Sequence, residues 1–226
     1  MSIVKTTAFF SLAVQVVTGM IDFYVLVLPS AVELLLLKQL LFMELLVQII
    51  EGIFYVWLAF NIATVTNITR KRYWDWMITT PVMLITLSSY LIYLRLKEKE
   101  STAIPDFMGV IQENYVEFIK IILLNAMMLI FGYLGEIGVL PVVTSVMAGF
   151  LPFFAMFYII YDSYAKYTSG GLSLYYYFFF VWGLYGVAAL MKYTPKNVFY
   201  NLLDLVAKNF FGLFLAYILV RENMNA

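Results

Sequence analysis

Long apolar stretches separated by short polar breaks run along the whole chain. A helix that crosses a lipid bilayer needs about 20 consecutive, mostly apolar residues. Stretches that meet this requirement lie at residues 6–28, 32–61, 73–96, 114–135, 138–162, 172–192 and 197–220. The pattern therefore predicts an all-α membrane protein, a seven-transmembrane-helix bundle whose single domain covers residues 1–226.

The breaks between these stretches carry residues that are typical of turns. The longest break, from Arg95 to Glu113, is rich in charged side chains and contains Pro105 and Gly109. We expect it to form a solvated loop. The stretch at 32–61 is longer than a bilayer requires, so we expect that helix to tilt or to project into water.

Basic residues at the ends of the stretches indicate the orientation, because short loops rich in Lys and Arg stay in the cytoplasm. Seven spans place the two termini on opposite sides. The side that holds the C-terminus carries Lys38, Arg95, Lys97, Lys99, Lys120, Lys166 and Arg221. The other side carries Lys5, Arg70, Lys71, Lys192 and Lys196. This bias predicts an N-terminus outside and a C-terminus in the cytoplasm.

The amino-acid composition excludes several kinds of functional site. Hydrophobic residues make up 64% of the chain and charged residues 12%, whereas soluble domains carry about 25% charged residues. Cysteine and histidine are absent, which excludes disulfides, thiolate chemistry, Ser-His triads and the commonest metal ligand. We expect neither a metal site nor enzymatic activity, and any proton chemistry must use Asp, Glu, Lys, Tyr or water. The net charge of zero gives no sign of a nucleic-acid partner.

Four charged residues stand in or beside the third and the last apolar stretch. Charges in hydrocarbon are costly, so these residues are functional candidates by default. Arg72, Asp75 and Thr79 are spaced by three and four residues and share one helix face. Asp204 and Lys208 are four residues apart and also share a face. The opposite signs predict that the two faces meet inside the bundle.

A buried lysine is the natural attachment point for a carbonyl cofactor, through a Schiff base. If Lys208 carries a protonated Schiff base, this cation needs counter-charge in a medium of low dielectric constant. Asp75 and Asp204 together over-neutralise it, and Arg72 restores the balance. The alternative is a buried ion-pair cluster that only fixes helix packing.

The sequence Arg-Tyr-Trp-Asp-Trp-Met-Ile-Thr-Thr-Pro at 72–81, taken with Asp-Leu-Val-Ala-Lys at 204–208 in the last span, resembles the microbial (type 1) rhodopsins. The resemblance implies all-trans retinal on Lys208, with Asp75 and Asp204 as counterions and proton acceptors beside Arg72. It also implies that the retinal is lined by Trp76, Thr80, Met128, Gly132, Phe153, Trp182 and Tyr185. Because 19% of the residues are aromatic, ordinary packing is the alternative for each single aromatic side chain.

Two departures from the ion pumps of that family bear on the mechanism. Outward proton pumps keep a carboxylic acid on the cytoplasmic side of the acceptor aspartate, where this chain has Thr86. The best-known pumps also carry carboxylates at the external end of the last two helices, whereas residues 191–197 are basic here. A vectorial pump would therefore be poorly equipped.

Further polar residues within the apolar stretches predict a water-filled path, the polar seam, along helices one, two, three and seven. Its members are Ser11, Gln15, Glu44, Gln48, Glu51, Asn61, Asn201 and Asn209. Glutamates at heptad spacing on the second helix, and Lys-Asn at 208–209, resemble channelrhodopsins, in which such glutamates act as gates and select cations. The alternative for Glu44 is a side chain that snorkels to the cytoplasmic interface. Thr80 and Asn125 stand where that family pairs a third-helix and a fourth-helix residue.

The short loops and the segment at 204–212 are similar to the rhodopsins of giant viruses, one group of which forms light-gated cation channels. Our first hypothesis is such a channel, which passes monovalent cations or protons. An outward proton pump without a carboxylic cytoplasmic donor is the second hypothesis, and a photosensor that signals to a partner is the third. The outer faces of the spans must meet lipid or other copies of the chain in a homo-oligomer.

Overall fold

The computed structural model describes residues 2–62, 64–99 and 104–225, and this part of the chain is helical throughout apart from short connections. The elements are α1 (Ile3–Val27), η1 (Val32–Leu34), α2 (Leu35–Asn61), α3 (Ile68–Glu98), α4 (Phe107–Glu136), α5 (Val142–Ser163), η2 (Ala165–Tyr167), α6 (Ser169–Ala189), α7 (Tyr193–Asp204), η3 (Leu205–Asn209) and α8 (Phe210–Asn225). The last three form one continuous span, so seven helical segments are long and apolar enough to cross a membrane. The predicted seven-helix membrane fold is confirmed.

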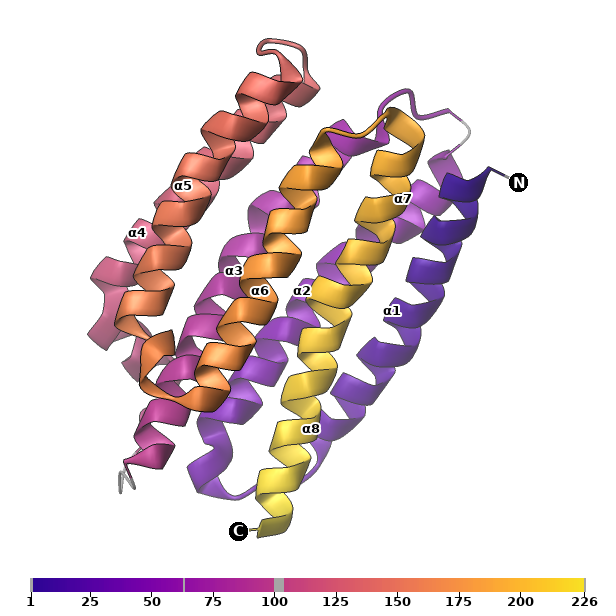
Figure 1. Ribbon diagram of the computed structural model, residues 1–226. Coiled ribbons are helices and arrows are strands. Elements are labelled where there is room, and N and C mark those ends of the chain that lie inside the picture. Colours follow the sequence, from indigo (N-terminus) through magenta and orange to yellow (C-terminus); the bar gives the residue numbers. More distant parts are fainter. Residues whose placement is uncertain (1, 63, 100–103, 226) are drawn as a thin grey trace.

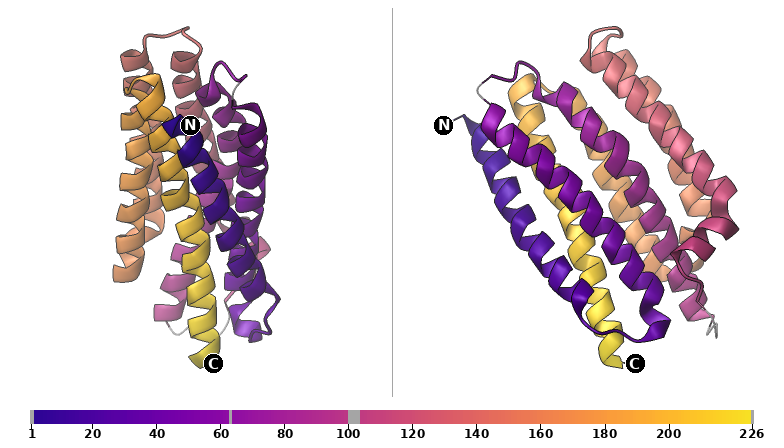
Figure 2. Two further views of the ribbon diagram at one scale, coloured as in Figure 1. Left: turned by 90° about the vertical axis from the view of Figure 1, so that its right-hand side faces the viewer. Right: turned by 180° about the vertical axis from the view of Figure 1, so that it is seen from behind.

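The spans form a bundle in which the α4–α5 hairpin lies on one side and α1 and α2 lie on the other (Figures 1 and 2). The rod formed by α7, η3 and α8 runs between α1 and α6, and the two termini lie at opposite ends of the bundle (Figure 1). We call these ends the N-terminal end and the C-terminal end. Which of them faces the cytoplasm stays a prediction.

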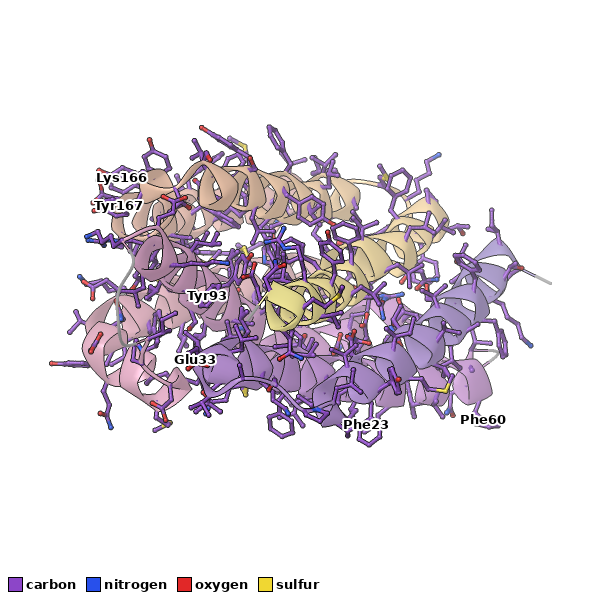
Figure 3. All side chains as sticks on the ribbon, turned by 90° about the horizontal axis from the view of Figure 1, so that it is seen from below. Phe23, Glu33, Phe60, Tyr93, Lys166 and Tyr167 are labelled. Carbon is purple, nitrogen blue, oxygen red and sulfur yellow. The ribbon has the colours of Figure 1, made fainter. Side chains whose placement is uncertain are left out.

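The outside and the inside of the bundle differ in chemistry. Phe23 and Phe60 are 58% and 85% exposed and lie on the outside of the bundle, whereas Tyr93 is buried (Figure 3). Many further large apolar side chains are exposed along the spans. Eight charged residues of the described part of the chain are buried instead, namely Asp22, Glu44, Glu51, Arg72, Asp75, Lys196, Asp204 and Lys208. A surface of this kind is suited to lipid, and the polar residues inside it form the site described below.

The predicted loop from Arg95 to Glu113 is wrong at both ends. Helix α3 continues to Glu98, and α4 already begins at Phe107. Asp106 explains the early start, because its side chain accepts a hydrogen bond from the backbone N–H of Gly109 at 2.9 Å and so caps α4. Basic residues in the last turn of α3 favour its continuation, since they interact well with the negative end of the helix dipole.

Candidate functional site

Lys208 lies at the centre of the bundle between two carboxylates. Its Nζ donates a hydrogen bond to Asp75 Oδ2 at 2.6 Å and is 3.6 Å from Glu51 Oε1. All three side chains are buried. The third and the last span therefore meet through opposite charges, as the spacing of their charged residues predicts. Glu51 joins them from α2, although the sequence pattern assigned it to the ion path.

Asp204, the second expected counterion, is held by other partners than Lys208. Its Oδ2 accepts hydrogen bonds from Arg72 at 2.9 Å and from Tyr55 at 2.8 Å. Its Oδ1 accepts a hydrogen bond from Tyr185 at 2.8 Å. Among the residues that the structure describes, no ion pair within 4 Å joins Asp204 to Lys208. Asp75 and Glu51 are thus the carboxylates in direct contact with Lys208, and the role of Asp204 as a second counterion stays a prediction.

The π-helical turn η3 provides a physical reason for this difference. In a regular α-helix, residues four apart, such as Asp204 and Lys208, lie above one another. In η3 the backbone hydrogen bonds reach one residue further, as from Phe210 N–H to the carbonyl of Leu205, and the side chains turn relative to one another. Tyr177 on α6 donates a hydrogen bond from its hydroxyl to the carbonyl of Val206 at 2.5 Å and so supports the irregular turn.

Arg72 is fully buried and is held on several sides. Besides Asp204, its guanidinium donates to Tyr55 Oη at 3.1 Å and to Asn201 Oδ1. The ring centroids of Phe54, Tyr55 and Tyr200 lie 5.4, 5.5 and 5.8 Å from its Cζ, within the range of cation–π attraction. Arg72 is therefore placed to offset the charge of Asp204, while Lys208 is left to the other two carboxylates.

A cavity with a mostly apolar lining opens beside Lys208, the one charged residue in its wall among the described residues. The seven residues that the resemblance assigned to retinal all line this cavity: Trp76, Thr80, Met128, Gly132, Phe153, Trp182 and Tyr185. An apolar pocket that ends on a buried amine fits a hydrophobic molecule with a terminal carbonyl group, since the amine is the nucleophile that such a group requires. The residues present thus fit retinal, and their individual contacts with it stay predictions.

Further residues line the same cavity but were not assigned from the sequence. They include Tyr73, Ser145, Gly149, Phe150, Gly186 and Tyr200. Gly186 is needed for packing, because a Cβ atom there would lie 2.6 Å from the ring of Phe150. Helical spacing from Trp76, Phe153 and Trp182 could have indicated these neighbours, although it could not have distinguished them from ordinary core residues.

The third-helix and fourth-helix pair expected from the channelrhodopsin resemblance is in contact. Asn125 donates a hydrogen bond from its side-chain amide to Thr80 Oγ1 at 2.8 Å. Thr80 in turn donates to the backbone carbonyl of Trp76 at 2.7 Å. These two hydrogen bonds link α4 to the part of α3 that lines the cavity.

On the N-terminal side of Lys208 the polar seam forms a closed network around Asn201. Ser11 donates a hydrogen bond to the backbone carbonyl of Asn201 at 2.8 Å. The side-chain amide of Asn201 donates to Thr7 Oγ1 at 2.8 Å, and its oxygen accepts from Tyr55 at 3.2 Å. Asn61 is not part of the seam, because it is half-buried at the end of α2 and bonds to the carbonyl of Trp57 in its own helix.

On the C-terminal side of Lys208 a second network joins α1, α2 and η3. Asn209 donates to Thr18 Oγ1 at 2.8 Å, and Thr18 donates to Gln48 Oε1 at 3.2 Å. The amide nitrogen of Gln48 then donates to Asp22. Thr18 and Asp22 were not expected from the sequence, although they continue the stripe of Ser11 and Gln15 at spacings of three and four residues. Gln15 is buried with no hydrogen-bond partner among the described residues.

Glu44 is buried inside the bundle, so the alternative of a side chain that snorkels to the interface is wrong. Its carboxyl group lies beside the side chain of Thr86, whose hydroxyl donates instead to the carbonyl of Val82 at 3.0 Å. A carboxyl group from α2 therefore reaches the region in which α3 lacks one. At the N-terminal end, Glu136 from α4 binds Lys196 at 2.7 Å, so the basic segment 191–197 does have an acidic neighbour.

Comparison with known proteins agrees with this geometry. The sequence profile of the family described as "Bacteriorhodopsin-like protein" matches residues 4–222. A green-light absorbing proteorhodopsin from Gamma-proteobacterium EBAC31A08 is 28% identical over 175 residues, which are 70% of this chain and 64% of that protein. The chain thus spans less than two thirds of the length of the curated relatives that it matches.

Two solved structures extend the comparison. The crystal structure of viral rhodopsin OLPVRII is 28% identical, with a TM-score of 0.83, and the match covers 96% of this chain and 98% of that one. A blue light-absorbing proteorhodopsin from Med12 is 20% identical, with a TM-score of 0.75 and coverage of 97% and 98%. The second likeness concerns the fold alone.

The Arg72–Asp204 pair should behave as a coupled unit. Arg72→Gln or Asp204→Asn alone leaves a buried charge without its partner, which costs roughly 3–5 kcal/mol of stability. The double variant should lose clearly less than the sum of the two single variants. The measurement is thermal unfolding of the purified protein, followed by circular dichroism. Lys166→Gln, which breaks an exposed pair with Asp162, is the control and should change little. Additive losses would contradict the coupling.

Proposed function

We propose that this chain, which belongs to the bacteriorhodopsin-like proteins, the microbial rhodopsins, is a light-gated cation channel that binds all-trans retinal through Lys208. Members of this family bind retinal as their chromophore and typically act as light-driven transporters or sensors. One observation carries the choice of a channel. Buried polar side chains from α1, α2, α3 and the last span follow one another on both sides of Lys208.

When bound, retinal supplies the absorption of light and the change of shape that starts the cycle. Asp75 is placed to receive the proton that Lys208 Nζ carries, since its Oδ2 lies 2.6 Å away. Glu51 lies on another side of Nζ and supports the positive charge there. Arg72 holds Asp204 through an ion pair of 2.9 Å, and Asp204 has no direct contact with Lys208, so we expect Asp75 to be the first proton acceptor.

The closed state is maintained by hydrogen bonds that cross the seam. On the side predicted to be external, Ser11, Tyr55 and Arg72 all bind to Asn201. On the other side, Asn209 binds Thr18. Because Asn209 follows Lys208 in the same turn, a movement of this turn would pull directly on α1. Water and cations could then enter between α1, α2 and the last span, where the carboxylates favour cations over anions.

An outward proton pump is the second candidate, and one observation favours it. Glu44 lies beside Thr86 and is buried, so it is placed to return a proton toward Lys208 in place of a donor on α3. The lack of a carboxyl group at Thr86 is therefore not sufficient to exclude a pump. The channel remains our first proposal because the seam also extends along α1 and the last span.

The attachment to Lys208 can be tested by colour. All-trans retinal added to the purified protein should produce a visible absorption band, and Lys208→Ala should abolish it because the nucleophilic amine is lost. Lys38→Ala should keep the band, since Lys38 is bound to the carbonyl of Leu28, away from the cavity. Circular dichroism verifies that both variants are folded. A visible band of unchanged position in Lys208→Ala would refute the assignment.

The arrangement of carboxylates predicts an order of colour shifts. A negative charge close to Nζ stabilises the ground state of the bound chromophore, so its removal should move the absorption to longer wavelength. Asp75→Asn should therefore cause a larger red shift than Asp204→Asn, because Asp204 is neutralised by Arg72. Absorption spectra of the two retinal-loaded variants, measured at one pH, provide the test. Equal shifts would show that Asp204 is an equal counterion.

Photocurrents distinguish the channel from the pump. Under illumination a channel current should reverse sign near the cation equilibrium potential and should follow that potential at two sodium gradients. A pump current should keep its sign throughout. The measurement is a current–voltage curve from voltage-clamped cells that express the retinal-loaded protein.

Glu44→Gln provides a second distinction in the same cells. In a pump, loss of this carboxyl should slow the last step of the photocycle about tenfold or more and reduce the steady current, since a proton donor contributes on that scale. In a channel, the reversal near the cation potential should persist with a changed amplitude. A wild-type current that never reverses would exclude the channel.

A further inference from the structure

Asp22 is a buried carboxylate that has no role in the light-driven steps proposed for Lys208, Asp75 and Asn201. It lies on α1 toward the C-terminal end and is 0% exposed. Its Oδ2 accepts a hydrogen bond from the side-chain amide of Gln48, whereas its Oδ1 has no partner among the described residues. A carboxylate in this position is costly unless something compensates its charge.

The backbone of α8 is packed directly against this carboxylate. A Cβ atom on Gly212 would collide with Asp22 Oδ2 and with the amide nitrogen of Gln48. Only glycine therefore allows α8 to approach so closely. Three helices, α1, α2 and α8, therefore enclose the carboxylate of Asp22 through specific contacts.

Several oxygen atoms around Asp22 lack a donor. Besides Asp22 Oδ1, both carboxylate oxygens of Glu44 and the amide oxygen of Asn209 are buried without a hydrogen-bond partner among the described residues. Glu44 and Gln48 are one turn apart on α2 and share a face. Asn209 is tied through Thr18 to Gln48. The unpartnered groups thus belong to residues of α1, α2 and the last span that are linked by this chain of hydrogen bonds or lie one turn from it.

The nearby lysines do not supply the missing positive charge. Lys208 is engaged by Asp75 and Glu51, and Lys38 donates to the backbone carbonyl of Leu28 at 2.9 Å. Two carboxyl groups and an amide oxygen without donors are the ligands that hard cations prefer. A monovalent cation with part of its water shell satisfies the acceptors and the charge together.

We propose that Asp22 and Glu44, with the amide oxygen of Asn209, form a binding site for a monovalent cation between Lys208 and the C-terminal end of the bundle. The inference rests on the proposed channel function and adds Asp22 as the residue that attracts the permeating ion on this side. Asn209 couples the site to light, because it belongs to the turn that carries Lys208.

Binding of Na⁺ in the dark tests the site without any current. Infrared difference spectra of the retinal-loaded protein in nanodiscs are recorded while Na⁺ replaces N-methyl-D-glucamine at constant ionic strength. The wild type should show a saturable change in the carboxylate bands. Asp22→Asn should weaken the apparent affinity for Na⁺ about tenfold or more, since it removes a charged ligand.

Asp162→Asn is the matched control, because Asp162 is an exposed aspartate paired with Lys166 at the end of α5. This variant should keep the wild-type affinity. Gly212→Ala provides a second test that retains every ligand. Its methyl group should displace Asp22 and Gln48 and also weaken binding, so the proposal can be judged if Asp22→Asn does not bind retinal.

The outcomes separate the site from the channel. If Na⁺ causes no saturable change in the wild type, or if neither Asp22→Asn nor Gly212→Ala alters the affinity, the cation site is refuted even when photocurrents reverse. If Na⁺ binds in an Asp22-dependent manner but photocurrents never reverse, the site stands and the channel is refuted.

Discussion

The rest of the structure depends on the burial of one amine, Lys208, among carboxylates. Removing an ion from water costs several kcal/mol even after the surroundings relax, and only close, well-oriented partners offset this cost. Asp75 and Glu51 meet that demand at Lys208, and Arg72 meets the corresponding demand of Asp204. Because these residues come from α2, α3 and the last span, the charge cluster also fixes how the three segments pack. The separation into the Arg72–Asp204 pair and the group of Lys208, Asp75 and Glu51 leaves Asp75 in direct contact with the amine.

The fold could be predicted from the sequence because membrane spans leave a strong signal in composition and length. Seven spans were confirmed, whereas the limits of α3 and α4 were missed. A cap such as Asp106 acts through a hydrogen bond that residue composition does not reveal. A run of charged residues indicates a loop by composition, although at the ends of membrane helices such residues can continue the helix into the interface.

The candidate site was predictable in its membership and less so in its pairings. Seven residues of the cavity wall were expected from the family resemblance. The partner of Asp204, however, depended on the π-helical turn at Lys208, which spacing rules for regular helices cannot anticipate. Asp22 was overlooked for a different reason. Its helical spacing from Thr18 was visible, yet one acidic residue near the end of an apolar stretch resembles an interfacial charge until the structure shows it buried.

The two halves of the seam differ in a way that bears on where a channel would be closed. Toward the N-terminal end, both carboxylate oxygens of Asp204 and both polar groups of the Asn201 side chain have partners, and Arg72 Nε is the one atom of these three side chains without one. Toward the C-terminal end, Asp22 and Glu44 retain acceptors without donors. A network whose groups are satisfied resists the entry of water, since water can offer it little, whereas unpartnered acceptors attract water and cations. In the proposed channel, the barrier in the dark would lie between Lys208 and the N-terminal end, where the bonds around Asn201 join α1, α2, α3 and the last span.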